Sequence, residues 1–191
     1  MTNRAMALFC CCTALMFVCP AADALSWLPA HVKENDGLSR QKKREIKLLF
    51  ADKIVVKKSE RKLYLMRQDK TLRSYRIALG NSPDGHKKRQ GDGRTPEGRY
   101  TIDWRQPSTK FRKSLHISYP SFRDRTSAWR TGDDPGGMIM IHGQPRSSRL
   151  SDLQESLSKE DWTQGCIAVS NLAIDEIWQY TMDGTPIEIL P

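Results

Sequence analysis

Residues 52–79 read DKIVVKKSERKLYLMRQDKTLRSYRIAL, a stretch in which three short apolar runs are separated by polar turns. The runs at 54–56, 63–66 and 75–79 are rich in β-branched and aromatic residues, which favour extended strands. The stretch therefore predicts an antiparallel meander, and it sets the expected fold class.

Strand signals continue to the end of the chain, with one long helix signal among them. Further strands are expected at 99–104, 116–119, 138–141 and 186–190. A helix is expected from Asn171, the candidate N-cap, to a stop at Asp183-Gly184. Its expected apolar face consists of Leu172, Ile174, Ile177, Trp178 and Met182. The sum is a mainly β (α+β) domain with one long C-terminal helix.

The composition agrees with a single folded domain. The chain has 191 residues, of which 38% are hydrophobic and 28% charged, and these values exclude a disordered or multi-span membrane protein. Lys and Arg outnumber Asp and Glu by 31 to 22, which gives a formal net charge of +9. A charge of this sign indicates an anionic partner.

The first 24 residues are typical of a secretory signal peptide. Arg4 gives the positive start, residues 5–18 are apolar, and Ala22-Asp23-Ala24 forms a cleavage signal. The apolar part is shorter than the roughly 20 residues of a bilayer span, so no stable membrane span is expected after cleavage, although a retained anchor is an alternative. We therefore expect the protein in the periplasm or cell envelope, where its charge meets envelope polymers and no nucleic acid.

Three segments follow from this organisation: the signal peptide at 1–24, a polar, partly helical arm at 25–50, and the folded domain at 51–191. Four of the five cysteines lie in the first segment, so only Cys166 remains after cleavage. A single cysteine in an exported protein indicates a reactive thiol or an intermolecular partner. No C-x-x-C or H-x-x-x-H spacing occurs, so no metal site is expected.

A histidine and this cysteine each lie beside a run that is predicted as a buried strand. The two motifs are Ile141-His142-Gly143 and Thr163-Gln164-Gly165-Cys166-Ile167. An imidazole activates a thiol by accepting its proton, and a backbone carbonyl such as that of Gly143 can orient the ring. Gly165 permits a close approach of substrate, so the amides of Gly165 and Cys166 are candidate oxyanion donors. The other histidines are expected at the surface: His31, His86 and His116.

From about Asp52 to Leu190 the chain resembles the YkuD-type L,D-transpeptidase catalytic domain. The resemblance rests on four segments in the family's order, namely 52–65, Gly91–Gly98, Pro135–Gly143 and Thr163–Ile167. It implies a β-sandwich-like fold and a cysteine nucleophile that acts on peptidoglycan stem peptides. Cys166 would be the nucleophile, His142 the general base and acid, Gly143 the orienting carbonyl, and Thr163 the Ser/Thr position of the motif. Gln164 and Ala168 depart from the family's common His and Arg.

The resemblance predicts an L,D-transpeptidase that forms a Cys166 thioester with the third stem residue and releases the terminal D-alanine. An amine acceptor would complete a transfer, whereas water would make the enzyme an L,D-carboxypeptidase or another amide hydrolase. A non-catalytic wall-binding module is a third alternative. No cofactor is implied, and carbapenem-type inhibitors are expected to react with Cys166. The basic, aromatic-rich residues 105–130 form either a lid over the substrate or a solvated loop.

Overall fold

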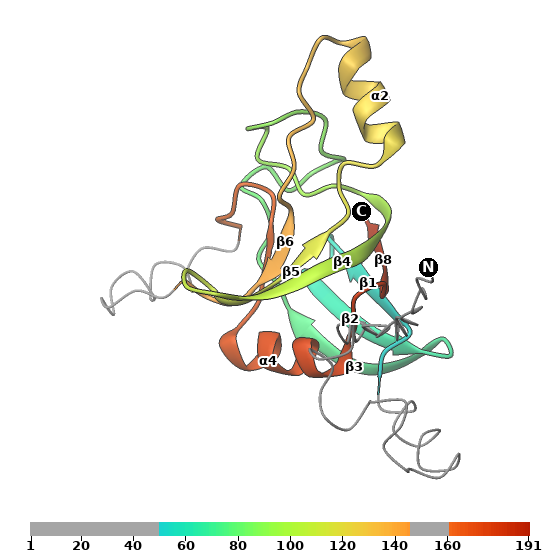
Figure 1. The fold of residues 1–191 in the computed structure, drawn as a ribbon, viewed down its shortest axis with the longest axis vertical. Helices are drawn as coiled ribbons and strands as arrows, with labels where there is room; N and C mark the ends of the chain where they lie inside the picture. Colours follow the sequence, from blue (N-terminus) through green and yellow to red (C-terminus); the bar gives the residue numbers. More distant parts are fainter. Residues whose placement is uncertain (1–49, 146–160) are drawn as a thin grey trace, which may run out of the picture. The chain divides into compact units, whose positions relative to one another are not determined.

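The computed structural model describes residues 50–145 and 161–191. Within these ranges the strands form one eight-stranded sheet in the order β3-β2-β1-β8-β4-β5-β6-β7 (Figure 1). The strands are β1 (Lys53–Lys57), β2 (Lys62–Arg67), β3 (Lys70–Arg76), β4 (Gly98–Ser108), β5 (Arg112–Ile117), β6 (Met140–His142), β7 (Ile167–Ala168) and β8 (Pro186–Leu190). The helices are α2 (Phe122–Arg130) and α4 (Asn171–Tyr180). The predicted signal peptide and almost all of the predicted arm lie outside the described residues.

The predicted meander is confirmed, because β1 pairs antiparallel with β2 and β2 pairs antiparallel with β3. The third strand begins earlier than predicted, at Lys70 and not at Tyr75. Gln68 and Asp69 have φ angles of 46° and 59°, the left-handed values of a tight two-residue turn, so the chain reverses at once. The C-terminal strand β8 pairs parallel with β1 and is the last strand of this half of the sheet before β4.

The long strand β4 joins the two halves of the sheet. Its first residues pair with β8, whereas its later residues pair with β5. The pairing with β5 shifts register between Ile102 and Trp104, an irregularity that bends a strand and increases its twist. The sheet therefore curls around a core. The expected mainly β class is confirmed.

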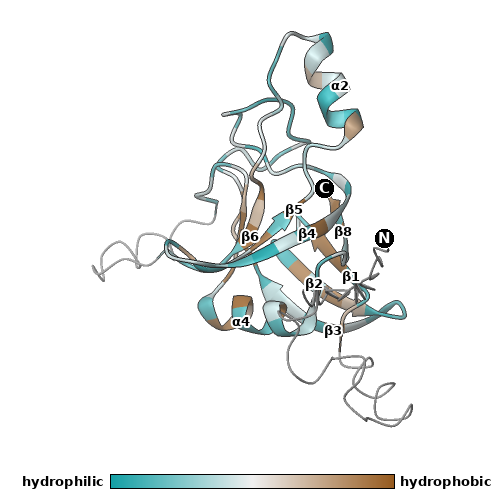
Figure 2. Cartoon of the chain, viewed as in Figure 1, coloured by the Kyte–Doolittle hydropathy of each residue, from teal (hydrophilic) through white to brown (hydrophobic). Residues whose placement is uncertain are grey.

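Aliphatic side chains from both halves of the sheet and from α4 fill this core. Fully buried members include Ile54, Leu65, Ile102, Leu115, Ile141 and Ile174. Figure 2 shows hydrophobic residues along β1, β6 and β8, whereas the tip of the β4–β5 hairpin is hydrophilic. Burial of each such side chain contributes about 1.5–3 kcal/mol, so the curled sheet is a rigid base for the loops at its edge.

The helices differ from the sequence expectation in three respects. Ser170, and not Asn171, caps α4, and the helix ends at Tyr180, before Asp183. Leu172 is exposed, and Met182 lies beyond the helix. The second helix, α2, was not expected; it lies with β5 and the end of β4 in the basic residues 105–130, which are thus largely regular secondary structure. No helix in the described ranges is long and apolar enough to cross a membrane.

Candidate active site

His142 is the last residue of β6, and its side chain is buried. Its Nδ1 lies 2.7 Å from the carbonyl oxygen of Gly143, which can only accept a hydrogen bond. Nδ1 therefore carries the proton, and Nε2 is left as the basic nitrogen. The ring of Phe111 lies against the imidazole at a centroid distance of 4.2 Å, and Trp162 meets it edge-on at 5.8 Å.

The pKa of His142 is lowered by burial, and the hydrogen bond to Gly143 opposes this shift only in part. Burial disfavours the charged imidazolium, because the ring has lost most of its contact with water. His142 is therefore neutral at neutral pH. A neutral imidazole with a free Nε2 is the form that can accept a proton.

The start of α4 holds the turn after His142. Asn171 Oδ1 accepts a hydrogen bond from the Gln144 N–H at 3.0 Å. A Cβ atom on Gly143 would lie 2.7 Å from the same Oδ1 and 2.9 Å from the Phe111 carbonyl oxygen, so only glycine fits here. Asn171 was expected to cap the helix, but it fixes the Gly143–Gln144 backbone that orients the imidazole.

Cys166 immediately precedes β7, which pairs parallel with β6 in the register Ile141 to Ile167. If this register is continued by one residue, Cys166 lies beside Met140. Met140 and His142 are two residues apart on β6 and point to the same face of the sheet, so Cys166 lies on the face that carries His142. The Sγ donates a hydrogen bond to the Met138 carbonyl at 3.6 Å. Among the described residues, no hydrogen bond joins Sγ to the imidazole.

Burial raises the pKa of the Cys166 thiol, whereas the Met140 N–H and the positive charge of Lys87 lower it. The net direction is upward, so the resting side chain is a thiol and not a thiolate. Together with the neutral imidazole, this describes a resting pair in which both groups are uncharged. The resting site is not an ion pair.

Met138 has a backbone that differs from the predicted strand at 138–141. Its φ angle is 56°, Met138 is 62% exposed, and β6 begins only at Met140. A left-handed conformation is unfavourable for a residue with a side chain and is enriched at functional sites. Here it turns the Met138 carbonyl toward the sulfur of Cys166.

The hydroxyl of Thr163 bridges the turn that precedes Cys166. It donates to the Cys166 carbonyl at 2.7 Å and accepts from the Gly165 N–H at 3.1 Å. The Gly165 amide, which was a candidate oxyanion donor, is therefore already bonded in this structure. Gly165 itself has a φ angle of 124°, and a Cβ atom there would lie 2.6 Å from the Arg94 carbonyl oxygen. Its glycine is required by both conformation and space.

The loop that packs on Gly165 is fastened by a buried ion pair. Lys87 Nζ lies 2.8 Å from Asp92 Oδ1, and the Asp92 carboxylate also accepts the N–H groups of Lys88, Arg89 and Arg94. Burial alone would raise the pKa of Asp92, but these donors outweigh it and hold the pKa at about 2. The Lys87–Asp92 pair thus holds the Arg94 backbone, whose carbonyl oxygen lies against Gly165.

Asp92→Asn is expected to lower the free energy of unfolding at neutral pH by about 2 kcal/mol, because a depressed carboxyl pKa is a stabilising contribution. For the wild type this contribution is complete above about pH 4 and is lost as the pH falls toward 2, so the difference between the two proteins vanishes there. Urea titrations at several pH values measure it. Asp84→Asn, an exposed change in the same region, is the control and should leave stability unchanged.

Two of the other three histidines are not simple surface residues. His116 is buried, bonded to Asp103 at 2.6 Å and stacked on Trp104, so its expected surface position was wrong. His86 is half-buried and joins Asp124 at 3.1 Å. His31 lies outside the described residues. Within the described ranges, no group of His, Cys, Asp or Glu side chains is arranged to hold a metal ion.

The structure thus brings together the five residues that the sequence motifs selected: His142, Gly143, Thr163, Gly165 and Cys166. Their catalytic roles remain predictions. Sequence reasoning missed four contributors, namely Lys87, Phe111, Met138 and Asn171. Nothing in their local sequence distinguishes them from surface or capping residues, because each acts through a contact with a distant segment.

Comparisons with known proteins agree with this geometry. Residues 51–189 match the family profile of the YkuD L,D-transpeptidase catalytic domain. YafK of Escherichia coli, a provisionally assigned L,D-transpeptidase, is 32% identical over 115 residues, which cover 59% of this chain but only 38% of YafK.

Two solved structures share the fold. One is the helical cell shape determining protein Pgp2 of Campylobacter jejuni, with 22% identity and a TM-score of 0.53, covering 72% of this chain and 46% of Pgp2. The other is Bd1075 of Bdellovibrio bacteriovorus, with 24% identity and a TM-score of 0.51, covering 74% of this chain and 48% of Bd1075. These two likenesses concern the fold alone. The profile match spans most of the chain, and the chain belongs to the L,D-transpeptidase catalytic domain family.

Proposed function

We propose that the protein is an exported cysteine L,D-transpeptidase that acts on peptidoglycan stem peptides. The observation that carries the proposal is the fixed tautomer of His142. Its Nδ1–H is held by the Gly143 carbonyl at 2.7 Å, and its free Nε2 is on the face of the sheet that also carries Cys166. Membership of the family supports the substrate class.

In the first step, Nε2 of His142 takes the thiol proton while Sγ attacks the carbonyl carbon of the third stem residue, expected to be meso-diaminopimelate. The C–S bond forms, and the carbonyl electrons move to the oxygen. Because the Gly165 N–H is already donated to Thr163, we assign the stabilising hydrogen bond to the Cys166 N–H. The oxyanion then collapses, and D-alanine leaves with the proton from His142.

The resulting thioester is resolved by a nucleophile whose proton passes to the same imidazole. An amine gives transfer and a new amide, and water gives hydrolysis as an L,D-carboxypeptidase. The acceptor decides between these outcomes, and the catalytic residues are the same for both. The signal peptide at 1–24 supports export, since the substrate lies outside the cytoplasm.

Incubation of the mature protein with purified tetrapeptide muropeptides tests this function, with Cys166→Ala in parallel. Mass spectrometry should show loss of D-alanine together with cross-linked or amine-exchanged products. Loss of D-alanine without a new bond would assign hydrolysis. Unchanged muropeptides, with equal wall binding by both proteins, would contradict the enzyme proposal and favour a wall-binding module.

The pH dependence of kcat/KM should reflect two neutral groups. His142 must be unprotonated to accept the thiol proton, and its lowered pKa means that activity falls only below the ordinary imidazole value of 6.5. The pKa of the Cys166 thiol is raised, so any change of kcat/KM on the alkaline side should lie above 9.0, the ordinary thiol pKa. We therefore expect a flat profile through neutral pH. An acidic limb centred above about pH 7 would contradict this assignment.

A further inference from the structure

The outward face of α2 carries an exposed aromatic stripe. Phe122 and Trp129 are 72% and 65% exposed, and they are seven residues apart, so they lie on the same side of the helix. The buried residues of α2, Asp124 and Ala128, lie on the opposite side. In Figure 1, α2 projects from the sheet beyond the loops. The two rings therefore face away from the rest of the domain.

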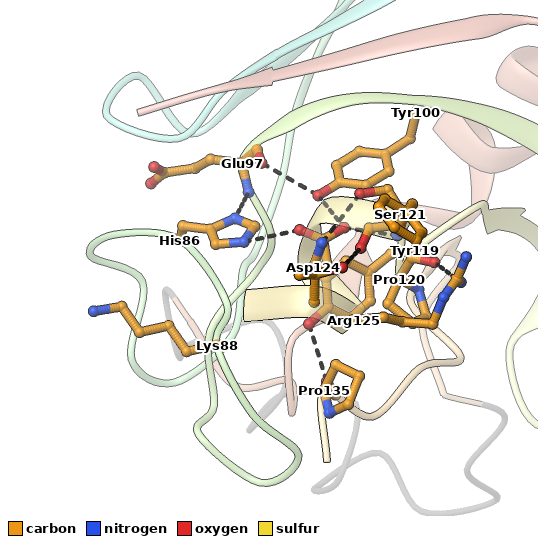
Figure 3. Close-up of polar contacts among 12 residues, drawn as sticks. His86, Lys88, Glu97, Tyr100, Tyr119, Pro120, Ser121, Asp124, Arg125 and Pro135 are labelled. Carbon is orange, nitrogen blue, oxygen red and sulfur yellow. Dashed lines mark hydrogen bonds and ion pairs between the residues drawn. The ribbon is translucent and has the colours of Figure 1, made fainter. Parts of the chain in front are cut away.

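This face is held rigidly, because the first turn of α2 is anchored to the domain (Figure 3). The Asp124 carboxylate accepts hydrogen bonds from the Ser121 N–H at 2.7 Å and the Tyr100 hydroxyl at 3.1 Å. The same carboxylate contacts His86 Nε2 at 3.1 Å. His86 Nδ1 accepts a hydrogen bond from the Glu97 N–H at 3.0 Å. The ring hydrogen is therefore on Nε2, which donates it in a hydrogen bond to the Asp124 carboxylate. A rigid stripe loses little entropy when a ligand binds.

Three arginines flank the stripe, and none of them forms an ion pair with a described carboxylate. They are Arg123, Arg125 and Arg130, and all three are exposed. Four other arginines of the domain form ion pairs, namely Arg61, Arg99, Arg105 and Arg112. The α2 face therefore combines exposed rings with unneutralised positive charge. Such a surface is complementary to an anionic ligand that also offers apolar faces.

The stripe is connected to the nucleophile by a short segment. Residues 131–137 run from α2 to Met138, whose carbonyl accepts the hydrogen bond from Cys166 Sγ. The Tyr119 hydroxyl fixes this segment through the Pro135 carbonyl at 3.0 Å. A pocket of about 750 Å³ opens beside the helix, and its lining carries both charge signs: Arg99 and Arg123 on one hand, and Glu97, Asp124 and Glu188 on the other. The segment thus joins the helix that carries the stripe to the residue whose carbonyl contacts the thiol.

We propose that the α2 stripe binds the peptidoglycan polymer outside the reacting stem, an inference that rests on the proposed function. The pyranose rings of a glycan strand present apolar faces that stack on Phe122 and Trp129. Carboxylates of neighbouring stems pair with the three arginines. A single stem bound at Cys166 does not cover an outward-facing helix, so the stripe selects the polymer over free muropeptides.

The test compares the wild type with a Phe122→Ala/Trp129→Ala double variant on intact sacculi and on soluble tetrapeptide muropeptides. The double variant should bind sacculi about tenfold more weakly, because exposed aromatic anchors dominate such interfaces. Its turnover of the soluble substrate should equal that of the wild type, which also shows that it is folded. Leu172→Ala removes a residue that is 80% exposed on α4 and should behave as the wild type.

An Arg123→Gln/Arg125→Gln/Arg130→Gln variant should bind sacculi with a weaker salt dependence than the wild type. Equal sacculus binding by the aromatic double variant and the wild type would overturn the proposal. Binding of the wild type to anionic phospholipid vesicles but not to sacculi would overturn it too, and so would stripe-dependent self-association without sacculus binding. If the wild type does not turn over the soluble muropeptides, the proposed function is contradicted. Sacculus binding is measured separately, so this result is distinguishable from failure of the stripe proposal.

Discussion

Cys166→Ser is expected to lower kcat/KM on a tetrapeptide stem by about three orders of magnitude or more. A serine hydroxyl ionises far less readily than a thiol. The thiol pKa is already raised by burial. In the proposed mechanism the sulfur depends on His142 for proton removal. An alcohol in the same place would be a much weaker nucleophile.

Two measurements belong to this prediction. Release of D-alanine gives kcat/KM, and thermal unfolding shows that the variant is folded, since the serine hydroxyl can donate to the Met138 carbonyl as the thiol does. Activity within tenfold of the wild type, in a protein with an unchanged Tm, would show that another residue is the nucleophile.

His142→Gln is expected to reduce kcat by about 10²- to 10⁴-fold, the usual contribution of a positioned general base. Glutamine fills part of the imidazole space between Phe111 and Trp162, but it cannot accept the thiol proton. KM should change little, because the imidazole acts in proton transfer more than in ground-state binding. The acidic limb of the pH profile should disappear together with the activity.

His116→Gln is the matched control for this variant. His116 is also a buried histidine, and it lies on the neighbouring strand β5, opposite Met140. Its bonds to Asp103 and its stacking on Trp104 are structural, so the substitution should reduce stability and leave kcat within about threefold of the wild type. Equal losses of kcat in the two variants would mean that His142 is a structural residue.

The sequence was most informative where local chemistry is restrictive. The alternating runs of 54–66 predicted the meander, and the glycines of the two motifs marked positions without space for a side chain. Gly143 and Gly165 illustrate this, because a Cβ atom on either would clash with backbone or with Asn171. The strand ends were less well predicted, since the turn at Gln68–Asp69 restarts the strand five residues early.

Long-range contacts could not be read from the sequence. Asn171 has the composition of a helix cap, but its amide holds the Gln144 N–H from 27 positions away. His116 lies in a basic segment that reads as surface, and only the pairing of β4 with β5 buries it. Likewise, the Gly165 amide was a reasonable oxyanion donor until the Thr163 hydroxyl was seen to bond it.

The helix α2 has a similar explanation. Its sequence is rich in arginine and has a weak apolar pattern, so periodicity alone does not predict it. Its formation depends on the capping box between Ser121 and Asp124 and on the partners that Asp124 finds at His86 and Tyr100. The exposed rings of Phe122 and Trp129 contribute little to folding.

The most direct test of the account is the intact mass of the protein during turnover. Mature wild-type protein mixed with a tetrapeptide stem and quenched in acid should gain the mass of the stem acyl group without its terminal D-alanine. Peptide mapping should place that mass on Cys166 as a hydroxylamine-sensitive thioester. Turnover with no adduct under any quench condition, or an adduct on another residue, would contradict a Cys166 acyl-enzyme.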